Sequence, residues 1–409
     1  MSEIIVIGGG LAGCEAAWQI AQYGVKTTIY EMRPNKTTPA HTTSNLAELV
    51  CSNSFKSQNT STALGLLKQE MSKLNSLLLY CAKKTAVPGG DALCVDRERF
   101  SSLVTEKISN HPNITVIREE IKDIPSNRPV IIATGPLTSD AFAESISNLA
   151  GNDNLYFFDA IAPSIEADSI NYDIVFRKSR YDKGEAAYLN CPMNQEEYYR
   201  FIDALLSAEK TKLHLEEEKN PLYFEGCLPI EVMAERGKET LCHGTMKPVG
   251  LTNPKTGERP YAVVQLRQEN EEGSIFGLVG FQTQLKIKEQ EKVFRMIPGL
   301  ENAVFIKYGQ VHRNTYINSP LILKASLNTK DDNMLFFAGQ ITGVEGYLAS
   351  ASTGIVAGIN SLRVLNGQEP LIFPKETVIG SLLNYISTPS DKDFQPMNAN
   401  LGLLPPLEI

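Results

Sequence analysis

The chain has 409 residues, of which 42% are hydrophobic and 21% charged, and its formal net charge is −8 at pH 7. It shows no apolar run near the roughly 20 residues that cross a membrane, no signal peptide, and seven cysteines without the CxxC spacing of zinc sites. We therefore expect a cytoplasmic protein of two or three domains, with reduced thiols, no metal and no membrane contact. Its negative net charge does not favour a polyanionic partner unless the protein has a local basic face.

The first thirty-one residues contain the strongest motif. Residues 4–7 form an apolar β-branched run that predicts a buried strand, and Gly8-x-Gly10-x-x-Gly13 follows directly. A predicted helix over 15–23 and a strand over 25–30 come next, with Glu31 at the strand tip. In this order the glycines allow a tight turn, close approach of a pyrophosphate and helix–strand packing, while the acid binds ribose hydroxyls. The stretch predicts a dinucleotide site, the alternative being a glycine-rich turn without a nucleotide.

The segment up to about residue 160 continues this pattern. Residues 62–80 have helical spacing with one apolar face, and a helix and a strand are predicted over 100–108 and 114–117. The strand predicted over 129–135 ends in Ala-Thr-Gly, as the last strand of the first sheet commonly does in flavoprotein dinucleotide domains. The apolar face of the first helix is expected in the core and consists of Leu64, Leu67, Met71, Leu74 and Leu78.

Residues 161–325 have a different character, with more charged and aromatic residues, a helix predicted over 196–215 and antiparallel strands over 263–267 and 276–280. From residue 334 the chain returns to a buried strand, a glycine-rich loop and a helix over 350–365. This return is typical of a second flavin-contacting element, the alternative being an ordinary strand–helix turn. The predicted fold is α/β: a Rossmann-like FAD-binding domain of the glutathione-reductase type, residues 1–160 and 326–409, interrupted by an α+β insertion domain, residues 161–325.

Longer motifs identify a family. They include Tyr30-Glu-Met-Arg-Pro34, Glu48-Leu-Val-Cys-Ser-Asn-Ser54, Ser179-Arg-Tyr-Asp-Lys-Gly184, Phe224-Glu-Gly-Cys-Leu-Pro-Ile-Glu231, His312-Arg-Asn-Thr315 and Phe337-Ala-Gly-Gln-Ile-Thr-Gly-Val-Glu-Gly-Tyr347. On these motifs nearly the whole chain resembles the TrmFO family of folate- and FAD-dependent tRNA (uracil-5-)-methyltransferases, relatives of the GidA/MnmG flavoproteins. The FAD contacts expected from the opening motif and the resemblance are Gly8, Gly9, Gly10, Leu11, Ala12, Gly13, Glu31, Arg33, Gly339, Gln340, Gly343, Gly346 and Tyr347.

The resemblance implies a defined reaction. 5,10-Methylenetetrahydrofolate supplies a one-carbon unit that FAD carries to C5 of a uridine; reduced FAD supplies the electrons that complete the methyl group, and NADPH or NADH reduces the flavin again. The expected substrate is the T-loop uridine of tRNA, whereas some mollicute relatives act on a uridine of large-subunit ribosomal RNA. Two rival functions remain: a GidA-like flavoprotein that adds another one-carbon-derived group to tRNA, and a non-catalytic RNA-binding relative that keeps FAD.

This chemistry requires a reactive thiol. C5 of uracil is weakly nucleophilic, so a thiolate must add to C6 and a base must later remove the C5 proton. A free thiol is mostly protonated at neutral pH, which places the reactive cysteine near a cation. By resemblance Cys227 is the nucleophile, and Cys51 serves as the base at C5 or protects the flavin adduct. On spacing alone each is more simply a small buried hydrophobic residue, as we expect of the other five cysteines.

The remaining candidates concern folate and RNA. By resemblance His312 stacks on the pterin ring of folate, the alternative being a core or surface histidine. A basic face for RNA phosphates requires that its members cluster in the fold, and it would consist of Arg177, Lys178, Arg180, Lys183, Lys247 and Arg313. Cys242 and His243 are two metal-type ligands without further spacing, which do not make a site.

Overall fold

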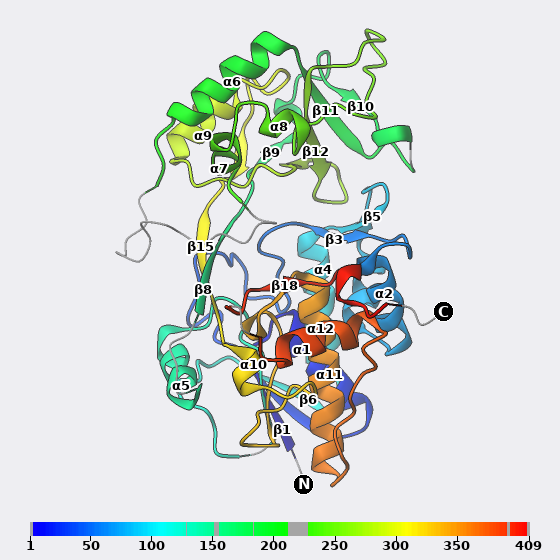
Figure 1. Ribbon diagram of the computed structural model, residues 1–409, viewed down its shortest axis with the longest axis vertical. Coiled ribbons are helices and arrows are strands. Elements are labelled where there is room, and N and C mark those ends of the chain that lie inside the picture. The colour runs from blue at the N-terminus through cyan, green and yellow to red at the C-terminus, as the bar shows by residue number, and fades with distance from the viewer. Residues whose placement is uncertain are drawn as a thin grey trace.

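The computed structural model describes residues 3–127, 129–150, 155–182, 184–211, 228–390 and 393–406. The chain forms two lobes, one above the other in Figure 1, and the marked N and C ends both lie at the lower lobe. We call the lower one the nucleotide lobe and the upper one the antiparallel lobe. Each has its own apolar cluster, the first drawn from both ends of the chain and the second from its middle.

A five-stranded parallel sheet organises the nucleotide lobe, in the order β16-β7-β1-β2-β6. Its strands are β1 (Glu3–Ile7), β2 (Lys26–Tyr30), β6 (Ile114–Ile117), β7 (Val130–Ile132) and β16 (Leu335–Phe337). Val6 on β1 pairs with Ile29 on one side and Ile131 on the other, and all three side chains are fully buried. The late strand β16 pairs in parallel with β7, so the chain returns to its first sheet after residue 334.

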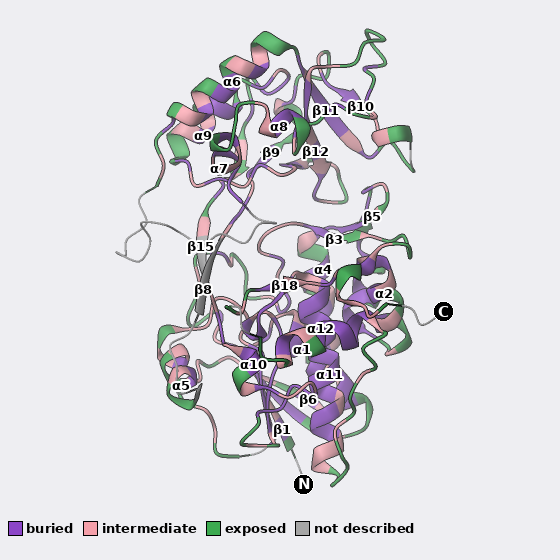
Figure 2. Cartoon of the chain, in the orientation of Figure 1, coloured by how far each residue is buried: buried purple, intermediate pink, exposed green. Residues whose placement is uncertain are grey.

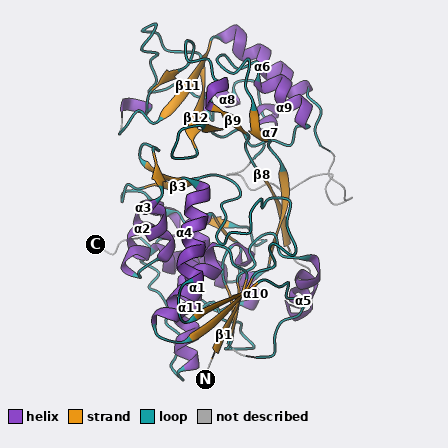
Figure 3. Ribbon diagram, turned by 180° about the vertical axis from the view of Figure 1, so that it is seen from behind, coloured by secondary structure: helices purple, strands orange, loops and turns teal. Residues whose placement is uncertain are grey.

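Two helices, α1 (Leu11–Gln22) and α11 (Tyr347–Leu365), pack closely beside this sheet, as the view from behind in Figure 3 also shows. A Cβ on Gly354 would lie 2.2 Å from the carbonyl oxygen of Ala12, so only glycine permits this approach of the two backbones. Both helices begin earlier than the sequence predicted, because Gly10 and Gly346 are their N-cap residues.

The helix predicted over 62–80 is two helices, α2 (Ala63–Lys73) and α3 (Leu77–Lys84). The break has a local cause, because Asn75 has a φ of 54° and the Ser76 hydroxyl accepts a hydrogen bond from Leu79 N–H as the N-cap of α3. Three of the five expected core residues are buried, and the other two pack partly exposed against the same cluster. Other elements of this lobe are β3 (Ser54–Ser57), β4 (Ala86–Val87), β5 (Ala92–Val95), α4 (Arg97–Ser109), α5 (Asp140–Ala150), α10 (Ser319–Ile322), β17 (Val344–Glu345), α12 (Val378–Ser387) and β18 (Met397–Asn398).

The antiparallel lobe contains a six-stranded sheet in the order β10-β11-β12-β13-β9-β14. Its strands are β9 (Ser164–Glu166), β10 (Phe176–Arg177), β11 (Tyr188–Met193), β12 (Ala262–Gln268), β13 (Ile275–Leu278) and β14 (Phe305–Lys307). Strands β12 and β13 pair antiparallel, as predicted. The helices are α6 (Gln195–Ser207), α7 (Ile230–Glu235), α8 (Thr240–His243) and α9 (Ile287–Phe294).

Helix α6 ends earlier than the predicted 215. Ala208 is already extended, with φ −71° and ψ 145°, and Lys210 forms a β-bridge with Leu285, so the backbone leaves the helix to pair with a distant segment. The end of the predicted helix, residues 212–215, lies outside the described residues.

A two-stranded ribbon, β8 (Leu155–Ala160) with β15 (Val311–Tyr316), lies between the lobes in Figure 1. It connects them at the level where β3 and β5 of the nucleotide lobe approach the upper sheet.

Helix α11 has the length and apolar composition of a membrane-spanning helix, and among the described residues no other helix does. An apolar run of this length was not expected from the sequence. The helix is mostly buried inside the protein, purple in Figure 2, where it packs against α1 as a core helix does.

Candidate functional site

The turn after β1 has the geometry of a dinucleotide cradle. Gly8 has a φ of 107°, and a Cβ there would lie 2.4 Å from the carbonyl oxygen of Ala133. A Cβ on Gly13 would lie 1.9 Å from the carbonyl oxygen of Gly8, so this glycine lets α1 pack against the turn. A Cβ on Gly10 would meet nothing within 4 Å. The open space at Gly10, directly before the first turn of α1, is where a phosphate can approach backbone N–H groups.

Glu31 closes this cradle from the tip of β2. Its carboxylate accepts hydrogen bonds from Gly9 N–H at 2.9 Å and from Arg33 Nε at 2.9 Å. Arg33 is buried and also pairs with Glu48 at 3.0 Å. Burial alone would raise the pKa of Glu31, but the hydrogen bonds and charge of Arg33 outweigh it and hold that pKa below its ordinary value. The carboxylate is therefore ionised and fixed where a ribose would need an acceptor.

A small cavity of about 80 Å³ lies against the cradle, lined by Gly8, Gly9, Gly10, Glu31, Arg33 and Thr138 among others. A second cavity, of about 610 Å³, is lined by Cys51, Asp159, Gln340, Glu345 and Tyr347 among others. Leu137 lines both, so the two cavities are neighbours. Residues expected to contact FAD from the two ends of the chain thus border two neighbouring cavities.

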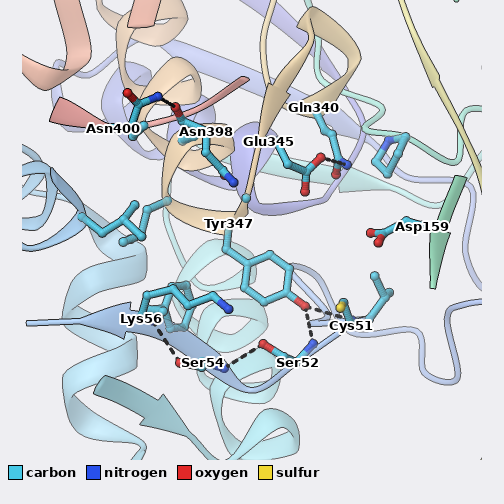
Figure 4. Close-up of a pocket in the computed structure, with 18 of the residues that line it drawn as sticks. Cys51, Ser52, Ser54, Lys56, Asp159, Gln340, Glu345, Tyr347, Asn398 and Asn400 are labelled. Carbon is cyan, nitrogen blue, oxygen red and sulfur yellow. Dashed lines mark hydrogen bonds between the residues drawn. The ribbon is translucent and has the colours of Figure 1, made fainter. Parts of the chain in front are cut away.

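The backbone around Cys51 is held in place at this larger cavity, called the site cavity below. Its N–H and that of Ser52 donate to the Tyr347 hydroxyl, at 2.9 and 3.0 Å (Figure 4). Burial raises the pKa of Tyr347, and the nearby Cys51 raises it further, so the phenol keeps its proton. Cys51 itself is half-buried, unlike the fully buried core cysteines.

Arg267 and Lys307, two side chains of the antiparallel lobe, also hold this loop in place. Asn53 donates to the Gln268 carbonyl at 2.9 Å and accepts from Arg267 Nε at 2.8 Å. Lys307 Nζ donates to the Val50 carbonyl at 3.0 Å. Burial lowers the pKa of Lys307, and the charge of Arg97 lowers it further. The Cys51 loop therefore lies at the junction of the two lobes, and residues of both lobes form hydrogen bonds with it.

Two acids that the sequence analysis did not single out face the same cavity, Asp159 on β8 and Glu345 on β17 (Figure 4). Glu345 accepts a hydrogen bond from Gln340 Nε2 at 2.6 Å. Burial raises the pKa of Glu345 well above its ordinary value, and electrostatic interactions with the nearby Asp159 and Cys51 raise it further. A buried carboxyl that keeps its proton at neutral pH is suited to donating it.

The sequence analysis also did not single out Arg97 as a site residue. Its guanidinium contacts Glu269 of the antiparallel lobe at 2.5 Å, and Glu269 accepts from Ser164 at 2.7 Å. Burial would lower the pKa of Arg97, but Glu269 and Tyr347 outweigh it and keep that pKa raised. A permanent cation therefore lies in the electrostatic neighbourhood of Cys51, which is the setting that a reactive thiol requires.

The second predicted flavin element contains three glycines with positive φ, of which Gly346 lines this cavity. Gly339 precedes the 3-10 turn Gln340–Thr342, Gly343 follows it, and Gly346 caps α11 with a φ of 95° that only glycine adopts freely. Gly346 N-caps α11, and the first turn of this helix, with its unpaired N–H groups, lines the site cavity.

Two of the predicted site residues are not among the residues that the structure describes. Cys227 and Lys183 lie outside the described residues. His312 and Arg313 are on β15, where His312 pairs in register with Asp159, a residue that lines the site cavity. The other described cysteines are buried, in agreement with a structural role: Cys14, Cys81, Cys94, Cys191 and Cys242.

Only some of the basic residues expected to bind RNA phosphates cluster in the fold. Arg177, Lys178 and Arg180 follow one another along β10 and the turn after it, and Arg180 donates to the Lys247 carbonyl at 2.8 Å. Lys178 is paired with Asp182 at 2.9 Å. Arg313, by contrast, is on the ribbon between the lobes, far from β10 in Figure 1. Four members thus share one edge of the antiparallel lobe, and the expected single face does not extend to Arg313.

Comparison with known proteins identifies relatives of the chain. Residues 3–369 match the family model of glucose inhibited division protein A. The chain is 58% identical over 408 residues, 100% of this chain and 93% of the relative, to "Methylenetetrahydrofolate--tRNA-(uracil-5-)-methyltransferase TrmFO" of Lactobacillus johnsonii. It is 57% identical over 406 residues, 99% of this chain and 93% of the relative, to the protein of the same name from Halalkalibacterium halodurans.

The fold has a solved counterpart. The structure of Aquifex aeolicus GidA in its form II crystal superposes with a TM-score of 0.71 at 18% identity, covering 94% of this chain and 67% of that one. Together with the family model and the full-length relatives, this places the chain in the glucose inhibited division protein A family, and within it among the TrmFO proteins.

Proposed function

We propose that this chain is a folate-dependent RNA uridine C5-methyltransferase that transfers the methylene of 5,10-methylenetetrahydrofolate to C5 of a uracil. The observation that carries the proposal is the site cavity beside a dinucleotide cradle. The Cys51 thiol and the protonated carboxyl of Glu345 line this cavity, and the cation of Arg97 lies in the electrostatic neighbourhood of Cys51. The relatives that match the full chain carry this activity in their names. The T-loop uridine of tRNA is the proposed target, and the cytoplasm is the proposed location.

The cradle and the cavity fit FAD. The open space at Gly10 suits a pyrophosphate, the ionised Glu31 suits a ribose, and the site cavity is large enough for a ring system. Residues 1–160 with 326–409 would form the FAD domain, and 161–325 the insertion. FAD, when bound, supplies the one-carbon transfer and the electrons that turn a methylene into a methyl group, with NADPH or NADH as the proposed source of those electrons.

The chain's own residues would divide the proton chemistry. Cys227 as a thiolate would form a bond to C6 of uracil and move electron density to C5, and that bond would break again when the C5 proton leaves. Cys51 would accept the C5 proton or protect the reactive centre, and its loop is held for this by Tyr347. Arg97 would stabilise negative charge on the thiol of Cys51. Glu345, which keeps its proton, would donate it during the reaction.

Folate would bind on the β15 side of the site cavity. His312 is paired with Asp159 there, which supports the proposal that it stacks on the pterin. Ribosomal RNA is the alternative substrate, and the alternative activity is that of a GidA-like flavoprotein.

The two cysteines can be separated by trapping. RNA with 5-fluorouridine at the target should form a covalent adduct with wild type, because fluorine cannot leave as the C5 proton does. Cys227→Ala should retain FAD but form no adduct, whereas Cys51→Ala should lose turnover and still be trapped. The reverse pattern would mean that Cys51 is the nucleophile. Mass spectrometry of bulk tRNA and rRNA from a deletion strain would then identify the RNA that loses 5-methyluridine, and loss from neither would overturn the proposed function.

A further inference from the structure

A cluster of three ligand-type side chains lies in the antiparallel lobe, at helix α8 (labelled in Figure 1) and distinct from the site cavity. Glu239 precedes this short helix, and Cys242 and His243 end it. Positions three and four residues apart share one helix face. One carboxylate oxygen, the thiol sulfur and one imidazole nitrogen all lie within 4.8 Å of one another. No other group of three such residues meets this spacing within the part of the chain that the structure describes.

The spacing suits a small tetrahedral ion. Cys242 Sγ lies 3.0 Å from Glu239 Oε2. An ion with a bond of about 2.3 Å to sulfur and of about 2.0 Å to oxygen or nitrogen separates its ligand atoms by roughly 3–4 Å. His243 is exposed, so its ring can reorient to complete the set without disturbing the core.

The carboxylate is already oriented by neighbours on two other elements. Tyr261, next to β12, donates to Glu239 Oε2 at 2.7 Å, and Tyr199 on α6 donates to Oε1. Ligating carboxylates are typically held in place by such outer hydrogen bonds. The cluster also opens on a cavity of about 490 Å³ that Lys247 and Arg259 border, so an ion can enter and a water can supply a fourth ligand.

We propose that Glu239, Cys242 and His243 form a binding site for a divalent cation of the zinc class. The donor set of one sulfur, one nitrogen and one oxygen suits borderline-soft ions, whereas Ca²⁺ and Mg²⁺ require oxygen ligands. The thiolate and the carboxylate together balance a charge of +2. On binding, the thiol of Cys242, which donates to Glu239 without the ion, loses its proton to solvent and forms a sulfur–metal bond.

A bound ion would stabilise helix α8 within the antiparallel lobe. Helix α8 has only four residues, too few to be stable by itself. Through Glu239, a bound ion would connect it to Tyr261 beside β12 and to Tyr199 on α6. The site is therefore structural in role, and it does not depend on the proposed function.

Cobalt titration of full-length protein, stripped of metal with a chelator, tests the site. Wild type should bind one Co²⁺ with a thiolate-to-cobalt charge-transfer band in the near ultraviolet, and Zn²⁺ should displace it while excess Mg²⁺ does not. Cys242→Ser should lose the band, and His243→Gln, at an exposed position, should weaken affinity at least tenfold without affecting folding. Matched controls are Cys81→Ala and His111→Gln, at a cysteine and a histidine of the nucleotide lobe, which should leave the titration unchanged. The proposal is overturned if wild type shows no such band, if Cys242→Ser retains it, or if Mg²⁺ competes.

Discussion

The two lobes place functional residues in opposite ways. In the nucleotide lobe the cradle is continuous in sequence, since Gly8, Gly10 and Gly13 and then Glu31 follow one another within a single strand–helix–strand unit. In the antiparallel lobe the side chains that contact the residues around Cys51 come from separate segments, such as Glu269 directly after β12 and Lys307 at the end of β14, and they act across the junction. A local unit fixes geometry through its backbone, whereas a junction fixes it only after the whole chain has folded.

The largest effect should come from breaking the cradle at Gly13. In Gly13→Val the new Cβ would lie 1.9 Å from the carbonyl oxygen of Gly8, where neither backbone can move aside. We expect a loss of at least about 3 kcal/mol, at the upper end of overpacking costs, visible as insoluble protein or a strongly lowered melting temperature.

Gly10→Val is the matched control for that change. Gly10 has an ordinary φ of −78° and nothing within 4 Å of its Cβ position, so this variant should fold. It should nevertheless purify without flavin, because the side chain occupies the space for the pyrophosphate. Full flavin content in folded Gly10→Val would contradict the dinucleotide interpretation.

The buried charge cluster behind the cradle should give the next largest effect. Arg33→Met leaves the carboxylates of Glu31 and Glu48 buried without their cation. Removing one partner of a buried ion pair costs about 3–5 kcal/mol, measurable by urea denaturation. Lys36→Met breaks a surface pair with Glu120, with lysine 43% exposed, and should cost less than about 1 kcal/mol. Equal effects of the two variants would show that the cluster does not stabilise the cradle.

These contrasts explain what the sequence could predict. The opening unit was predictable because periodicity, glycine spacing and the acid all lie within 31 residues. The break between α2 and α3 was missed because it depends on Ser76, whose hydroxyl caps α3 and donates to Glu15 on another helix. Asp159 and Arg97 reach the Cys51 region from β8 and α4 only in the fold.

Two missed residues did leave a signal in the sequence. Glu345 is an acid inside an otherwise apolar and glycine-rich motif, which is itself a sign of a buried functional carboxyl. Glu239 lies three residues before Cys242 and four before His243, so the one-face spacing was visible once the acid was counted as a ligand.

Glu15 on α1 offers a pH test of the nucleotide lobe. Burial raises the pKa of Glu15 from 4.5 to about 7, although Ser76, Leu78 and Leu77 hydrogen-bond to its carboxylate. Between these values the folded state binds more protons than the unfolded state, so stability falls as pH rises. A shift of this size corresponds to roughly 3 kcal/mol lost between pH 4.5 and 7.

Glu15→Gln should remove that slope in denaturation curves measured across this pH range. Gln still accepts from Ser76 but cannot accept from both neighbouring N–H groups, and that cost does not depend on pH. Glu231→Gln is the counterpart in the antiparallel lobe, where burial also raises the pKa of Glu231 above its ordinary value, so its slope should change with the same sign. An unchanged slope in Glu15→Gln would mean that this carboxyl ionises freely in the folded protein.

The smallest effect concerns RNA at the β10 edge. If the wild-type protein contacts about three to five phosphates, the logarithm of its RNA-binding constant should fall with the logarithm of the salt concentration with a slope of about −2 to −4. Arg177 is exposed, and Arg177→Ala should reduce the slope by about 1 and weaken binding equally for all RNA sequences. Filter binding at several salt concentrations measures both quantities.

Arg180 is the instructive contrast on the same edge. Its guanidinium donates to the carbonyls of Lys247 and Val249, both at 2.8 Å, and to Gln265 at 3.1 Å, so its hydrogen bonds hold the protein together. Arg180→Ala should therefore lower the melting temperature more than Arg177→Ala does, while changing the salt slope less. If Arg180→Ala instead changes the slope as much as Arg177→Ala does, Arg180 contacts phosphate as well, and a flat salt response in wild type would remove the basic edge altogether.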